Sequence, residues 1–196
     1  MELPNDVGVF TLDPLDPMLN EQVSLLAAMH YRYLFEELAR TGRRAGGCPL
    51  APWLTTLLLR HDGGVVGFVA LDVRTRAIEL LYVEQPYRRH GLATAALDAL
   101  SGAMPELLAL KAPLTPAGRA LAERLGLPVV EPETGQQEAA RADLTAWEQN
   151  LRVQCRHRRG GRPDRPCKRC YRNALEGYVE DLVVEHAAAI RAGVSV

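Results

Sequence analysis

Hydrophobic and polar positions along the chain first follow the period of a strand and then that of a helix. Residues 7–12 alternate weakly, are rich in β-forming residues and end at an Asp-Pro pair, so they are predicted to form a strand. Asp16 and Pro17 are the residue types of a helix N-cap and first turn, and apolar residues then recur at helical spacing until Thr41 and the glycine after it. We expect either one long helix or two abutting ones here.

The period changes to that of a sheet after residue 53. Three β-rich runs follow one another, at 54–60, 65–73 and 77–83. The first two are separated by a His-Asp-Gly-Gly sequence, which favours a hairpin, and the last two by a short turn. The natural prediction is three successive antiparallel strands.

A loop and an Ala-rich helix follow the third strand. Beyond them we predict a strand at 107–111, a helix at 116–125 that Gly126 stops, and a short strand at 129–130. The elements therefore occur in the order β, α, βββ, α, β, α, β. This order predicts an α/β (α+β) fold.

The last third of the chain is predicted to be a helical extension around a basic segment. Thr134 and Gln137 resemble a capping box, which would open a helix with the inner stripe Ala140, Leu144, Trp147 and Leu151. A second amphipathic helix has its apolar stripe at Leu175, Tyr178 or Val179, Leu182, Val183, His186 and Ile190. We expect a domain at 1–132 and an extension at 133–196.

Composition supports a globular chain with an uneven charge distribution. Of 196 residues 47% are hydrophobic, which is enough for a core, and no apolar run reaches the ~18 residues of a membrane span. The acidic start lacks the pattern of a secretory signal, so we expect a cytoplasmic protein without membrane contact. The formal net charge is −1, but residues 152–172 have nine basic side chains against one acid, Asp164, and the remainder is acidic.

The loop from Arg88 to Thr94 has the composition of an anion site. Amides in the first turn of a helix lack internal partners, and the helix dipole favours negative charge there. Gly91 allows close approach of the backbone, small residues at 93 and 94 leave room, and Arg88, Arg89 and His90 are cationic or polar donors. An ordinary strand-to-helix turn with solvated arginines is the alternative for such a short motif.

The order of elements together with this loop resembles the Gcn5-related N-acetyltransferases (GNAT), over about residues 7–131. Their signature is Gln or Arg, two residues, Gly, one residue, and Gly or Ala, which here reads Arg88-Arg89-His90-Gly91-Leu92-Ala93. The resemblance implies a mixed, mostly antiparallel twisted sheet flanked by helices. It also implies acetyl-CoA as substrate, with its pyrophosphate on the amides from Arg88 to Thr94.

The same resemblance implies how the rest of the cofactor is held. The pantetheine arm is expected to pair with the strand backbone at Leu81, Tyr82 and Val83. The amide of Val83 is our candidate for polarising the thioester carbonyl, as in an oxyanion hole. Thr115 occupies the position of a family asparagine and is a further candidate for cofactor binding.

Acid–base chemistry requires one group to deprotonate the ammonium and another to protonate the leaving thiolate. Glu79 is the candidate base, although a glutamate solvated at a strand edge is an equal alternative, and Glu84 is interpreted as a solvated turn residue. The family's usual acid is a tyrosine, whose position Ala122 occupies here. One possibility is that Tyr82, Tyr87 or water replaces this acid. The others are that turnover is slow, or that the chain binds acyl-CoA without acetylating. Packing is the alternative role of both tyrosines.

Three of the four cysteines lie in the basic segment. Cys155-x-His157 and Cys167-x-x-Cys170 together provide the four ligands of a tetrahedral Zn²⁺, which with a full coordination sphere would be structural. The alternatives are a redox-active thiol pair and an unstructured basic loop.

The leading hypothesis is thus an acetyl-CoA-dependent N-acetyltransferase that acts on an amine of an unknown acceptor. The alternative is a non-catalytic acyl-CoA-fold module whose zinc-stabilised basic extension binds nucleic acid or protein. Partners considered for the segment 152–172 are RNA, an acidic protein, and a second copy of the chain in a homodimer.

Overall fold

The computed structural model describes residues 10–41, 47–104, 108–132, 134–155, 157 and 167–193. Part of the first expected strand (7–9), Leu107 and most of the basic segment lie outside the described residues, as do the side chains of Thr134, Gln137 and Ala140. The elements, in chain order, are β1 (Phe10–Pro14), α1 (Asn20–Thr41), β2 (Leu54–His61), β3 (Gly64–Asp72), β4 (Ala77–Val83), a 3-10 turn (Gln85–Tyr87), α2 (Leu92–Ala103), β5 (Ala109–Lys111), α3 (Pro116–Leu125), β6 (Val129–Val130), α4 (Thr134–Gln154) and α5 (Lys168–Arg191).

The strands form one six-stranded sheet in the order β1 to β6. The first four are antiparallel to their neighbours, whereas β4–β5 and β5–β6 are parallel, because α2 and α3 carry the chain back between them. The expected mixed, mostly antiparallel sheet flanked by helices is therefore confirmed.

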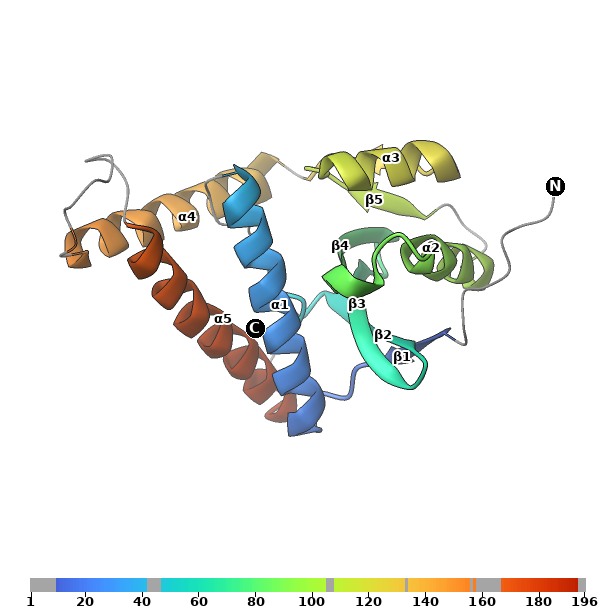
Figure 1. The fold of residues 1–196 in the computed structure, drawn as a ribbon, viewed down its shortest axis with the longest axis horizontal. Coiled ribbons are helices and arrows are strands. Elements are labelled where there is room, and N and C mark those ends of the chain that lie inside the picture. The colour runs from blue at the N-terminus through green and yellow to red at the C-terminus, as the bar shows by residue number, and fades with distance from the viewer. Residues whose placement is uncertain are drawn as a thin grey trace.

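The sheet separates two helical layers (Figure 1). On one face α1 packs against the sheet, and α5 packs against α1. The opposite face carries α2 and α3, whose apolar side chains form two further clusters with the strands. Side chains of β4 alternate between these layers: Tyr82 joins the α1 cluster, and Val83 joins the α2 cluster.

Helix α1 is continuous and begins later than its apparent cap suggests. Asp16 shapes the preceding turn: its carboxylate accepts from the amide of Met18 at 2.9 Å, and its carbonyl accepts from that of Leu19 at 3.1 Å. The expectation that Asp16 and Pro17 form the N-cap and first turn is thus wrong, since the helix starts at Asn20. The alternative of two abutting helices is also excluded, because α1 runs unbroken to Thr41.

Two bulges distort the central strands. In β3, Val66 is the extra residue where the register with β2 shifts between Leu59 and Arg60. In β4, Glu79 is the extra residue where the register with β3 shifts between Ala70 and Leu71. The second bulge lies at the point where β4 begins to part from β5.

The C-terminal helix shares its core with the sheet domain. Leu175, Val179, Val183 and Ala187, spaced at helical intervals on α5, are buried in the same cluster as α1 and the strands. The division of the chain near residue 132 stays a prediction that unfolding can test. None of the described helices is long and apolar enough to cross a membrane.

Gly67 lies where β3 and β4 approach closely. A Cβ built on it would lie 2.3 Å from the carbonyl oxygen of Tyr82, which is backbone and has little freedom to move. We expect Gly67→Ala to lower the free energy of unfolding by about 1–3 kcal/mol in denaturant titrations. As a control, Gly177→Ala in the middle of α5, where a Cβ meets nothing within 4 Å, should raise it by about 0.4–1 kcal/mol. Equal stability of Gly67→Ala and the wild type would contradict the close approach.

The docking of α5 gives a second stability prediction. Leu175 is fully buried, so Leu175→Ala should lower the free energy of unfolding by about 2–5 kcal/mol. Val184 on the same helix is 52% exposed, and Val184→Ala should change it by less than about 0.5 kcal/mol. Because the core is shared, circular dichroism and Trp fluorescence should report one common transition. Two separate transitions would instead support an independent extension.

Candidate functional site

The loop between β4 and α2 presents free backbone amides at its end. Gly91 is the N-cap of α2 with φ 81°, and no side chain caps the helix. The first intrahelical bond is from the amide of Ala95 to the carbonyl of Gly91 at 2.9 Å, so the amides of Leu92, Ala93 and Thr94 precede it. These three N–H groups and the dipole of α2 make this end of the helix suited to an anion.

The cationic side chains around this loop do not all lie where the motif predicts. Arg89, with φ 69°, and His90 are exposed in the loop. The guanidinium of Arg88 instead lies against β4 and α1. Arg124 from α3 donates to the hydroxyl of Thr94 and so adds a cation at the start of α2 that the sequence motif did not indicate.

One edge of β4 is free of strand pairing near the loop. The described pairing of β4 with β5 consists of Ala77 with Ala109 and Ile78 with Leu110, after which the two strands part. The amide of Glu84 donates to the carbonyl of Val66 on β3 at 2.8 Å. Along an antiparallel pair, every second residue directs its N–H and C=O to the partner strand, and the residues between them direct theirs away. Because Glu84 bonds to β3, the odd-numbered residues of β4 direct their N–H and C=O away from β3, toward the open side. Leu81 and Val83 therefore offer hydrogen-bonding groups there.

A cavity of about 840 Å³ connects this free edge with the loop. Its walls come from β4, the loop, the β5–α3 region and one face of α1. The residues of α1 that line it are Tyr33, Glu36, Glu37 and Arg40. Their positions, three and four residues apart, place them on one side of the helix. This spacing was not used in the sequence-based prediction, although it is the signal that could have indicated a second wall of the site.

Glu79 lies at the bottom of the opening between β4 and β5. Its side chain is 14% exposed and pairs with the ammonium group of Lys111, at the end of β5. The interpretation of Glu79 as a solvated edge residue is therefore wrong, and Lys111 is a partner that the sequence did not indicate. The ion pair bridges the two strands where their backbones separate.

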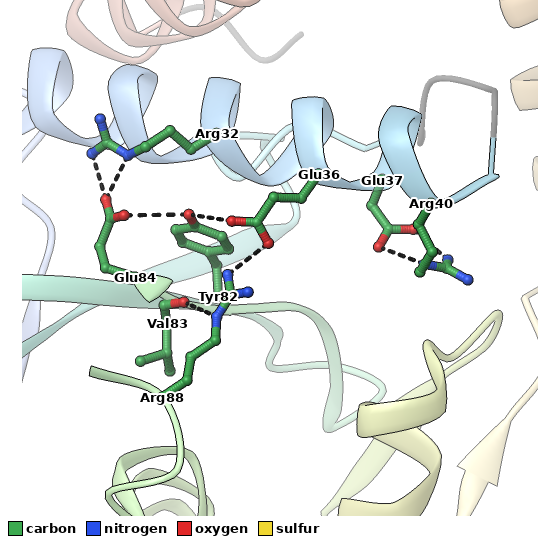
Figure 2. Close-up of polar contacts among 8 residues, drawn as sticks. All are labelled: Arg32, Glu36, Glu37, Arg40, Tyr82, Val83, Glu84 and Arg88. Carbon is green, nitrogen blue, oxygen red and sulfur yellow. Dashed lines mark hydrogen bonds and ion pairs between the residues drawn. The ribbon is translucent and has the colours of Figure 1, made fainter. Parts of the chain in front are cut away.

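Tyr82 lies at the centre of a polar network between β4 and α1 (Figure 2). Its hydroxyl is 3.2 Å from a carboxylate oxygen of Glu36 and 3.3 Å from one of Glu84. Arg32 donates to Glu84 at 2.7 Å, and Arg88 lies 2.7 Å from the other oxygen of Glu36. Glu84, only 17% exposed, is thus not the solvated turn residue that was expected.

Two tyrosines at the cavity have strongly shifted acidity. Burial, and then the carboxylates of Glu36 and Glu84, raise the pKa of Tyr82 well above its ordinary value. Burial and the Glu37 carboxylate act in the same way on the pKa of Tyr33. Both hydroxyls therefore keep their protons at neutral pH and act as hydrogen-bond donors.

The other positions of the family pattern have structural uses here. Ala122 is buried in the cluster between α3 and the sheet. The hydroxyl of Thr115 caps α3 by accepting from the amide of Gly118 at 3.0 Å, although Thr115 also lines the cavity. Tyr87 is 38% exposed and its ring lies 6.1 Å from that of His61.

The expected metal ligands are brought together at the junction of α4 and α5. The ligand atoms of Cys155, His157, Cys167 and Cys170 all lie within 4.8 Å of one another, and His157 Nδ1 is 3.2 Å from Cys170 Sγ. Cys167 caps α5, and its sulfur accepts from the amide of Cys170. Ligands at tetrahedral Zn–S distances of about 2.3 Å would be roughly 3.8 Å apart, so the cluster has the size of a zinc site.

Hydrogen bonds within the cluster shift the pKa values of two of its thiols in opposite directions. Backbone N–H donors of Cys167 and His157 lower the pKa of Cys155 to about 6. Hydrogen bonds from its thiol to Cys155 and Cys167 raise the pKa of Cys170 to about 12. The neighbouring Tyr171 is buried against Trp147, with ring centroids 5.0 Å apart, and is not available for stacking on a base.

The chain was compared with solved structures, with curated proteins and with protein families. Similar solved structures include a ribosomal-protein-alanine N-acetyltransferase from Brucella melitensis biovar Abortus 2308, with 22% identity, 60% of this chain and 90% of that one covered, and a TM-score of 0.44. A predicted acetyltransferase with acetyl-CoA from Clostridium acetobutylicum has 17% identity, with 61% of this chain and 90% of that one covered, and a TM-score of 0.44. An aminoglycoside acetyltransferase from an uncultured soil metagenomic sample has 24% identity, with 64% of this chain and 94% of that one covered, and a TM-score of 0.41.

No curated protein matches the chain in the sequence comparison. The model of the acetyltransferase (GNAT) family matches residues 21–127, which is more than half of the chain and contains strands β2 to β5, the loop between β4 and α2, and the cavity-lining residues of α1. The chain therefore belongs to the GNAT family of acetyltransferases.

Proposed function

We propose that the chain is an acetyl-CoA-dependent N-acetyltransferase whose acceptor is an amine. The observation that supports this most directly is the single cavity that connects the amides at the start of α2, the free edge of β4 and the acidic face of α1. An acyl-CoA requires the first two features, for its pyrophosphate and its pantetheine arm. A cationic amine suits the third.

In this proposal the cofactor follows the surface from the loop to the opening of the sheet. The pyrophosphate binds the amides from Arg88 to Thr94, with Arg89, His90 and Arg124 as nearby donors. The pantetheine arm pairs with the backbone groups of Leu81 and Val83 that point away from β3, where it takes the place of Arg88 at the Val83 carbonyl, and Thr115 also lines the cavity.

The reaction needs two proton movements and one stabilised oxyanion. The neutral amine attacks the thioester carbonyl, whose oxygen accepts from the amide of Val83 while it is negatively charged. Glu79, directly or through water, takes the proton of the ammonium group. Water returns one to the leaving thiolate, because the raised pKa of Tyr82 makes its hydroxyl a weaker acid than the thiol that would form. The products are an amide and CoA.

The C-terminal residues 133–196 are proposed to be an extension that supports the acyl-CoA domain at 1–132. Its Cys/His cluster is proposed to hold a structural Zn²⁺, because four soft or borderline ligands fill a tetrahedral coordination sphere and leave no position for a substrate. The metal would join the end of α4 to the start of α5. The basic segment 152–172 is proposed to contact an acidic partner, either protein or RNA.

The enzymatic proposal is tested by calorimetry with acetyl-CoA and CoA, followed by a screen of amines in which thiol release is measured. Glu79→Gln should lower kcat about a hundredfold or more if Glu79 is the base. Glu123→Gln, an exposed carboxylate on α3, should keep wild-type activity. Full activity of Glu79→Gln would exclude Glu79 as base, and absence of CoA binding at millimolar concentration would contradict acetyl-CoA dependence.

Metal analysis tests the zinc proposal. Protein purified without chelator should contain about one equivalent of Zn²⁺ per chain, and Cys167→Ser should contain much less and unfold at a lower temperature. Cys48→Ala should keep its zinc, because Cys48 is buried in the α1 cluster, outside the metal cluster. Zinc far below one equivalent in the wild type would favour the free-thiol alternative.

A further inference from the structure

We propose that Arg88 binds Glu36 while the cavity is empty and leaves it when acetyl-CoA binds, so that Glu36 becomes the counterion of the acceptor's ammonium group. This inference rests on the proposed function and names a specificity-determining residue for the acceptor. Glu36 lies on α1, far in sequence from the phosphate-binding loop, and the family signature does not contain it.

The side chain of Arg88 connects three parts of the site (Figure 2). Its Nε donates to the carbonyl oxygen of Val83 at 2.7 Å. One terminal nitrogen lies 2.7 Å from a carboxylate oxygen of Glu36. The guanidinium carbon lies 5.3 Å from the centre of the Tyr82 ring. Arg88 therefore holds the cavity face of α1 against the end of β4.

Acetyl-CoA competes with both polar contacts of Arg88. The carbonyl of Val83 belongs to the free edge of β4, where an amide of the pantetheine arm would donate. Arg88 is the first residue of the loop that is proposed to bind the pyrophosphate. Its side chain can therefore turn from the carboxylate of Glu36 to a phosphate of CoA without movement of the backbone. A pyrophosphate has more negative charge than one carboxylate and can accept two hydrogen bonds from the N–H groups of one guanidinium, so it is the stronger partner for Arg88.

The departure of Arg88 changes Glu36 more than the neighbouring acids. Glu84 keeps its own partner, Arg32, and Glu37 keeps Arg40, whose Nε lies 3.1 Å from it. Glu36 keeps the Tyr82 hydroxyl but loses the guanidinium. Its side chain is 39% exposed and lines the cavity, so an ammonium group can take the place of the guanidinium. The cofactor would then bind before the acceptor.

The first test measures CoA affinity by calorimetry and requires no turnover. Glu36→Gln keeps the shape of the side chain but removes the charge that retains Arg88, so CoA should bind about threefold to tenfold more tightly. Asp13→Asn removes a carboxylate that pairs with Arg60 at 2.8 Å on β1–β2 and should leave the CoA affinity unchanged. In an Arg88→Ala background, where CoA binds more weakly, Glu36→Gln should have no further effect.

Unchanged or weaker CoA binding by Glu36→Gln would overturn the exchange of Arg88 between its two partners. The same gain in the Arg88→Ala background would also overturn it, because the gain would then be independent of Arg88. Absence of CoA binding to the wild type is a different result, since it contradicts the proposed function itself.

The second test concerns the acceptor and uses the amine that releases thiol fastest in the screen. Glu36→Gln should raise KM for this amine about tenfold and lower KM for acetyl-CoA, because the carboxylate binds one substrate and opposes the other. General misfolding would not move the two constants in opposite directions. An unchanged KM for the amine would overturn the acceptor role of Glu36.

Discussion

The geometry of the candidate site depends most on the separation of β4 from β5. Ile78 and Leu110 form the last described pair, and beyond them the parallel ladder ends while β4 continues to Val83. Backbone groups away from water require hydrogen-bond partners, so a strand edge that is left open inside the fold invites another chain of amides. The bulge at Glu79, the Glu79–Lys111 ion pair and the cavity all lie at this opening.

Local sequence signals predicted the bounds of several helices and strands correctly. The strand at Ala77–Val83, the helix at Pro116–Leu125 and the strand at Val129–Val130 have the expected bounds, because turn residues or a glycine mark each end. Asp16 misled the prediction of the first helix, since its side chain stabilises a turn as readily as a helix cap. Local pattern does not distinguish these two uses of an aspartate.

The contacts within the site could not be predicted in the same way. The motif from Arg88 to Ala93 located the loop, but the partner of the Arg88 side chain lies 52 residues earlier in the chain, on α1. Lys111 and Arg124 likewise reach the site from later elements. Register and the packing angle of α1 decide which side chains meet, and both arise from tertiary contacts. The Cys/His cluster was easier to recognise, because ligand types and spacing already restrict its geometry.

Helix α1 has neighbours on two sides, and this has a consequence for how acceptor preference can diversify or be redesigned. One face is committed to the sheet and another to α5, and both belong to the same buried cluster. The α1 side chains that line the cavity without belonging to this cluster are Glu36, Glu37 and Arg40. A library restricted to these three positions would sample new acceptors at little risk to folding, whereas randomisation of Tyr33 or of the sheet and α5 faces would disturb packed side chains.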